Sequence, residues 1–182
     1  FLALVAVCIG LAVCLAGALF AGPLARLLGA SDLLLDDTVT YLRVQLCFAP
    51  MAMLQLLFES FFVTAGRPGL GLGLATAAGV TNAVLDYLYM GPMQMGILGA
   101  ALGTVTGYSI PAVAGGLFFL LRRQGLRFGR PHGDLRMLGR ACFNGASEMV
   151  TNLSMAVTTF LFNAIMMAYL GEAGVSAITI VL

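Results

Sequence analysis

The chain of 182 residues is 60% hydrophobic and 9% charged, with a formal net charge of +1. Soluble domains carry about 25% charged residues, and a soluble globular fold is excluded here because too few polar residues are present to cover its outside. Lipid removes this difficulty, since a helix in a bilayer satisfies its own backbone hydrogen bonds.

Long apolar runs follow one another along the chain, each with the length of about 20 residues that a membrane-spanning helix needs. They cover residues 1–28, 38–65, 69–90, 96–121 and 141–170, and another begins near residue 175. Gly66-Arg67-Pro68 separates two of these runs with a helix-stop and a helix-start residue. No run alternates as a barrel strand would. The sequence therefore predicts an all-α, polytopic transmembrane helix bundle with five full spans and the start of a sixth.

The ends of the chain lie inside apolar runs. It starts at Phe1 and stops at Leu182, with no basic leader segment and no cleavage site. We therefore expect an internal fragment of a longer membrane protein.

The basic residues predict the orientation. All nine are Arg, and six of them lie between residues 122 and 140, flanked by two apolar runs. Such a loop is typical of the cytoplasmic side of a membrane protein rather than of a nucleic-acid partner. Counting back along the spans puts the turn at 91–95 outside, Arg67 inside and the acidic stretch at 29–37 outside.

Glycine is concentrated on two neighbouring runs. Gly alternates with Leu over residues 69–74, and Gly99, Gly103 and Gly107 recur every fourth residue on the next run. No strand precedes the first group, so a dinucleotide-binding loop is not indicated. Small residues let membrane helices approach closely. We expect the runs at 69–90 and 96–121 to pack antiparallel, with the 99–107 face buried.

Asp86 is the strongest candidate functional residue. A carboxylate at membrane depth costs about 2.5–3.5 kcal/mol or more, so it needs a reason. Asn82 lies one turn earlier, and side chains four residues apart share a helix face. A carboxylate beside an amide can take up a proton or help to coordinate a cation. The alternative is a structural clasp, in which both side chains hydrogen-bond to a neighbouring helix.

Further polar side chains are candidates for lining a cavity. The run at 141–170 carries a stripe of polar residues that points to a protein interior or to water, and Met in such a wall adapts to varied ligands. Glu148 also lies near the cytoplasmic end, where water could hydrate it. Glu59, one turn after Gln55, is a weaker candidate because it can reach toward water. The candidates are Glu148, Asn152, Met155, Thr159, Asn163 and Glu59.

No feature indicates an enzyme, a metal centre or a cofactor. The four cysteines lie in or beside apolar runs without CxxC spacing, so we interpret them as packing residues that form no disulfide. A nucleophile–base pair and an HExxH motif are both missing from the sequence.

Four short stretches resemble one known family when taken in order. They are YLRV at 41–44, TAGRP at 64–68, NAVLDYLY at 82–89 and MGILGAALGT at 95–104. They look like the fourth helix, the turn after it, the fifth helix and the entry to the sixth helix of multidrug and toxic-compound extrusion (MATE) transporters. The stretch 144–163 is similar to the seventh helix of the bacterial drug-exporter branch.

The resemblance implies part of a two-lobe, twelve-helix transporter in the bacterial inner (plasma) membrane. Residues 1–122 would supply the third to sixth helices of the amino-terminal lobe, 123–140 the cytoplasmic loop between lobes, and 141–182 the start of the second lobe. Asn82, Asp86 and Thr104 match the cation-linked site of the first lobe in that family. The Asp of the first helix that completes the site would lie upstream of Phe1.

The function implied is secondary active antiport. The lipid-embedded protein would export amphipathic, often cationic drugs and toxic compounds in exchange for H⁺ or Na⁺ by alternating access, and it would need no cofactor beyond the coupling ion. One alternative is a flippase of the same superfamily for lipid-linked oligosaccharides, whose cavity should contain several Arg. Another is a membrane subunit without transport activity, which should not place Asp86 at membrane depth.

Overall fold

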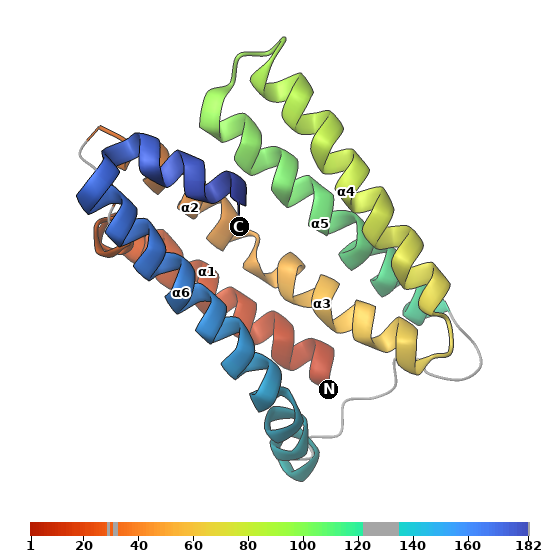
Figure 1. Ribbon diagram of the computed structural model, residues 1–182. Helices are drawn as coiled ribbons and strands as arrows, with labels where there is room; N and C mark the ends of the chain where they lie inside the picture. The colour runs from red at the N-terminus through yellow and green to blue at the C-terminus, as the bar shows by residue number, and fades with distance from the viewer. Residues whose placement is uncertain (29, 31–32, 122–134, 182) are drawn as a thin grey trace. The chain divides into compact units, whose positions relative to one another are not determined.

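The computed structural model describes residues 1–28, 30, 33–121 and 135–181, and these form helices and turns without a strand (Figure 1). The chain divides into two compact units, Phe1–His132 and Gly133–Leu182. The helices are α1 (Leu2–Leu27), α2 (Leu35–Cys47), α3 (Ala49–Thr64), α4 (Pro68–Met90), α5 (Gly96–Leu121) and α6 (Leu135–Val181). The second unit contains α6 and the first unit contains the others.

The outer surface of the described helices is apolar. Four of these helices are long and apolar enough to cross a membrane, and the number is five if the bent pair α2–α3 forms one span. Large side chains such as Leu15 and Leu19 are 67% and 76% exposed, and no described polar residue is fully buried. So many large apolar side chains on the outside are unfavourable in water and favourable in lipid. The prediction of an all-α membrane bundle is confirmed.

The second predicted span is bent. The sequence predicted one straight run over 38–65, whereas the helix axis bends by 53° between α2 and α3. The break falls at Phe48, which ends α2 and precedes α3. Pro50 explains it, because its ring nitrogen carries no hydrogen to bond the carbonyl of Leu46 four residues earlier. Pro50 marks this bend, whereas Pro23 and Pro111 lie inside the unbroken helices α1 and α5.

The turn between α3 and α4 follows the predicted stop and start. Gly66 has a φ of 69°, a left-handed conformation that other residues rarely adopt. The Arg67 N–H donates to the carbonyl of Phe62 at 2.9 Å, and the Gly66 N–H donates to that of Val63 at 3.0 Å. These two bonds satisfy the last carbonyls of α3 in a Schellman motif. Pro68 then begins α4.

The bent span α2–α3 lies in the middle of the first unit. It packs against α1 on one side and against α5 on the other, and α4 packs mainly against α5. On α1, the missing side chain of Gly10 leaves room for Pro50, since a Cβ there would lie 2.6 Å from the Pro50 Cα. Gly17 makes the same kind of room for Leu46. Small residues therefore let α1 approach both halves of the bent span.

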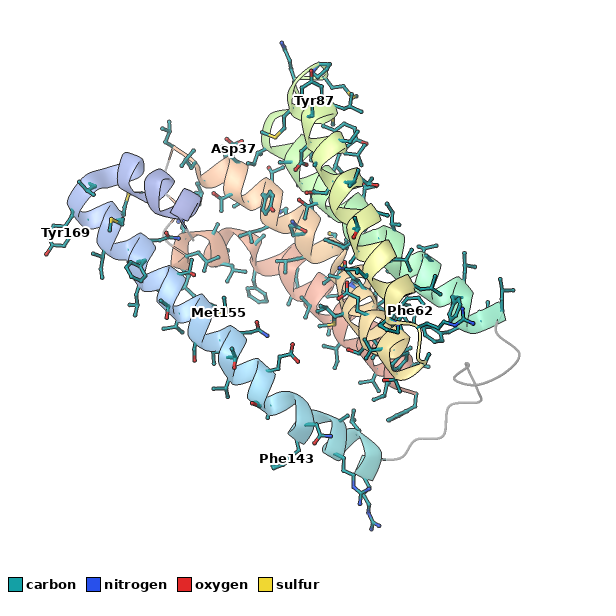
Figure 2. All side chains as sticks on the ribbon, turned by 45° about the vertical axis from the view of Figure 1, so that its right-hand side comes forward. Asp37, Phe62, Tyr87, Phe143, Met155 and Tyr169 are labelled. Carbon is teal, nitrogen blue, oxygen red and sulfur yellow. The ribbon has the colours of Figure 1, made fainter. Side chains whose placement is uncertain are left out.

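A phenylalanine cluster joins α3 to α5. Phe58, Phe62 and Phe119 are buried together. The rings of Phe58 and Phe119 stack with centroids 5.8 Å apart. Figure 2 shows Phe62 near the end of α3, close to where α4 begins. The cluster fixes this end of the first unit, because buried aromatic pairs add about 0.5–1.5 kcal/mol beyond their area.

Helices α4 and α5 run antiparallel and side by side (Figure 1). Gly99, Gly103 and Gly107 are buried, which confirms the predicted 99–107 face. The expectation for the Gly-Leu stretch was mostly wrong. A Cβ added at Gly69 or Gly73 would have no neighbouring atom within 4 Å. Of the three glycines in this stretch, only Gly71 lies against another helix, where it faces Phe62 of α3. The face of α4 that meets α5 is its later part, near Ala78 and Asn82.

Helix α6 begins at Leu135, within the stretch that the sequence predicted as a loop up to residue 140. Its path is interrupted at Gly171, where φ is 64° and ψ is −154°. This break coincides with the predicted gap between the run at 141–170 and the run that begins near 175. The predicted Arg-rich loop lies mostly outside the described residues, which resume at 135.

The predicted orientation can be checked at the described turns. Met93 lies in the exposed turn between α4 and α5, and Arg67 is exposed between α3 and α4. We expect a single cysteine at Met93 to react with an impermeant maleimide in intact cells, and one at Arg67 to react only after permeabilisation. Both variants require a background in which the four native cysteines are replaced. The reverse labelling pattern would contradict the orientation.

Candidate ion-binding site

A row of side chains on α4 rests in a row of glycines on α5. The glycines lack side chains, so the two backbones approach closely and the α4 side chains fill the spaces. A Cβ at Gly107 would lie 3.1 Å from the Asn82 Cβ, and one at Gly99 would lie 2.7 Å from the Tyr89 Cβ. The candidate residues therefore lie in the helix interface, not on a lipid-facing side. The facing pairs are Asn82 with Gly107, Asp86 with Gly103, and Tyr89 with Gly99.

Asn82 and Thr104 are brought together across this interface. The Asn82 Nδ2 donates to the Thr104 Oγ1 at 3.4 Å, a long hydrogen bond. The Thr104 hydroxyl in turn donates to the backbone carbonyl of Ala100 at 3.0 Å. The amide nitrogen of Asn82 and the hydroxyl oxygen of Thr104 thus meet across one helix contact. Two of the three candidate site residues are linked directly.

Asp86 is the third candidate residue, and one of its oxygens has no partner. The residue is half-buried, and its Oδ1 is shielded from solvent with no hydrogen-bond partner among the described residues. Burying such an acceptor without a donor costs about 1–3 kcal/mol, and more for a charged group. A bound proton or cation would supply the missing partner. Asn82 makes the interhelical bond of the structural clasp, whereas Asp86 Oδ1 does not.

A second polar link joins α5 to the bent span. The Tyr108 hydroxyl donates to the Gln45 Oε1 at 3.1 Å, and the Gln45 Nε2 donates to the Tyr41 hydroxyl at 2.9 Å. Tyr108 lies one turn after Thr104, so both side chains are on one face of α5. Sequence reasoning missed this link, because Gln45 and Tyr108 are 63 residues apart and show no local pattern.

The strength of this link can be measured. We expect Tyr108→Phe to lower the stability of the protein in detergent by about 1 kcal/mol, because it removes one interhelical hydrogen bond. Tyr87→Phe is the matched control, since Tyr87 is 73% exposed. A double-mutant cycle with Gln45→Leu should show that the two losses do not add. Additive losses would contradict the link.

The remaining candidates lie on other helices, α3 and α6. Glu59 is half-buried on α3 and accepts a hydrogen bond from the Gln55 Nε2 at 3.0 Å. On α6, Asn163 is half-buried and the other members of the stripe are exposed; Figure 2 shows Met155 midway along the helix. A role in lining a cavity stays a prediction for all of them. The stripe consists of Glu148, Asn152, Met155, Thr159 and Asn163.

A pocket of about 350 Å³ opens between α1 and α2, apart from the polar cluster. The pocket is lined by Val13, Ala16, Gly17, Phe20, Pro23, Leu24, Leu27 and Leu46. No charged side chain lines it, so it offers an apolar surface only.

In the part of the chain that the structure describes, no group of three His, Cys, Asp or Glu side chains could hold a metal ion.

The apolar outer surface and the candidate spans define a polytopic α-helical integral membrane protein. Comparison with known proteins shows which proteins the chain resembles. Residues 1–88 match the MatE family model. The chain is 33% identical over 116 residues to the multidrug export protein MepA of Staphylococcus aureus (strain MRSA252), and 34% identical over 98 residues to that of Staphylococcus saprophyticus. These alignments cover 63% and 54% of the chain.

A solved structure shares the fold. An inward-facing multidrug resistance MATE family transporter of the MOP superfamily superposes with a TM-score of 0.89 over 97% of the chain and 41% of that structure, at 19% identity. The matches therefore make the chain similar to MATE family transporters, over residues 1–88 for the family model and over 116 residues for the S. aureus protein. It spans about a quarter of the length of its curated relatives: 25% of the S. aureus protein and 21% of the S. saprophyticus protein.

Proposed function

We propose that the chain is part of a secondary active antiporter that exports amphipathic, often cationic compounds in exchange for H⁺ or Na⁺. The single observation that carries the ion-coupling proposal is the buried, unpartnered Oδ1 of Asp86, held in a membrane helix opposite α5. Ionisable groups at membrane depth mark ion or substrate pathways. In this proposal Asp86 binds the coupling ion, and Asn82 and Thr104 supply neutral oxygen atoms beside it.

Coupling requires the bound ion to favour one conformation over another. An ion that binds equally well to both states shifts nothing. In this proposal, binding at Asp86 changes the free energy of the α4–α5 contact, because the carboxylate lies inside that contact. Opening of the site to alternate sides of the membrane would then follow the occupancy of Asp86.

The names of the curated relatives support small molecules as the substrate class. The curated relatives are named multidrug export proteins, which supports small-molecule export over translocation of lipid-linked oligosaccharides. The interiors of α3, α4 and α5 also carry no Arg, whereas a cavity for a pyrophosphate lipid calls for several cations.

The test is transport by the complete protein whose reading frame contains this chain. Purified protein in liposomes is loaded with ethidium as a cationic dye, and a pH gradient and a Na⁺ gradient are imposed separately. We expect dye export driven by one of the gradients. Export with neither gradient, together with translocation of a lipid-linked oligosaccharide, would overturn the proposal in favour of the flippase.

A further inference from the structure

Gly103 faces the carboxylate of Asp86 across the α4–α5 contact. A Cβ at position 103 would overlap the Asp86 Oδ1, and it would lie 3.2 Å from the Asp86 Cγ and 3.3 Å from its backbone nitrogen. Glycine inside a helix is about 0.5–1 kcal/mol less favourable than alanine. A glycine at this buried point of α5 is therefore unfavourable for the helix itself, and a contact with a neighbouring group has to account for it.

The neighbouring glycines of the same face meet different atoms. The Cβ built at Gly99 would approach the Cβ and the backbone carbon of Tyr89 at 2.7 and 3.1 Å. At Gly107 it would approach the Asn82 Cβ and the carbonyl oxygen of Ala78 at 3.1 and 3.2 Å. Of these three glycines, Gly103 is the one whose missing side chain makes room for a carboxylate oxygen.

We propose that Gly103 is a positioning residue of the ion site. The space left by its missing side chain forms a socket that holds the Asp86 Oδ1 against α5, out of solvent. Thr104, which accepts the hydrogen bond from Asn82, follows Gly103 directly in the chain. The socket therefore sets where the carboxylate lies relative to the neutral oxygens. This inference rests on the proposed function of Asp86 in ion coupling.

A methyl group at position 103 would fill the socket and displace the carboxylate while leaving all three candidate ion ligands in the chain. Displacing a ligand through a supporting residue costs about 10–100-fold in ion affinity. Filling the space at Gly99 disturbs the same pair of helices without reaching Asp86. The effect of Gly103→Ala on ion dependence should therefore exceed that of Gly99→Ala, even where both lower stability.

The experiment compares Gly103→Ala, Gly99→Ala and Asp86→Asn in the complete protein. Dye efflux and the unfolding temperature in detergent are measured over a series of pH values and Na⁺ concentrations, because an ion that binds only the folded state stabilises it increasingly as its concentration rises above the Kd. We expect Gly103→Ala to shift the half-activating ion concentration about tenfold or more, and Gly99→Ala to leave it within about twofold.

The outcomes separate the socket from the proposed function. An unchanged ion dependence in Gly103→Ala, with Asp86→Asn inactive, overturns the socket alone, as do equal shifts in both glycine variants. Wild-type efflux by Asp86→Asn overturns the function on which it rests. If Gly103→Ala does not fold, Asp86→Glu moves the carboxylate by one methylene with Gly103 intact. A similar shift there supports the socket, and a wild-type ion dependence overturns it.

Discussion

Asp86→Asn is expected to reduce ion-driven efflux by the complete protein to the background of empty liposomes while the protein still folds. Asparagine has nearly the shape of aspartate, but it has no carboxylate to bind a proton or a cation. The Asp86 Oδ1 has no hydrogen-bond partner among the described residues, so the substitution removes no bond made by that atom. Transport should therefore fail because the ion site is lost, not because the fold is lost.

The measurement is dye efflux under an imposed ion gradient, together with the unfolding temperature in detergent. Asn82→Ala and Thr104→Ala should weaken efflux less, since each removes one neutral oxygen and the hydrogen bond between them. Ser60→Ala on the exposed side of α3 serves as the control for a polar residue remote from the cluster. Efflux at the wild-type rate would make Asp86 structural, and a failure to fold would favour the clasp.

Gly115→Ala is expected to destabilise the protein by about 1–3 kcal/mol, the usual result of adding a methyl group to a tightly packed interior. A Cβ at Gly115 would lie 2.7 Å from the Cβ, Cγ and Cδ2 of Phe58. Phe58 belongs to the cluster that joins α3 to α5, and its ring cannot move without disturbing Phe119. The strain should therefore spread through the cluster.

Gly116→Ala provides the matched control, because a Cβ there would lie 3.7 Å from the Phe58 Cε2, an ordinary contact. The readout is the unfolding temperature in detergent, where Gly115→Ala should unfold several degrees earlier than Gly116→Ala. The double variant with Gly115→Ala and Phe58→Leu should lose less stability than the sum of the losses in the two single variants. Equal unfolding temperatures for the two alanine variants would contradict the close α3–α5 contact.

Much of the fold could be predicted because a membrane helix leaves a long apolar run in the sequence. The position of α5, the turn at Gly66 and the break at Gly171 all followed from such runs and from the glycine and proline residues between them. The bend at Phe48 did not, because apolar side chains continue through it and only Pro50 marks it. The apolar pattern reports contact with lipid, not the direction of a helix.

The arrangement of the candidate site could be predicted from the sequence only where its residues share one helix. Asn82 and Asp86 lie four residues apart, so their common face follows from helix geometry. Thr104 came from the family resemblance alone, since the register between two helices cannot be read from either one. The contact of Gln45 with Tyr108 and the approach of Gly103 to Asp86 depend on the same register. They required the three-dimensional arrangement of the helices.

The glycine face of α5 also has a consequence for biogenesis. Among the four single helices that could span the membrane, α4 is the least hydrophobic and α5 is the next. A segment that carries Asp86 enters the bilayer from the translocon less readily than an apolar one. The short connection at residues 91–95 and the close contact along Gly99, Gly103 and Gly107 let the two helices enter as a hairpin. Insertion as a hairpin would bring Asp86 against its partner helix before it meets lipid.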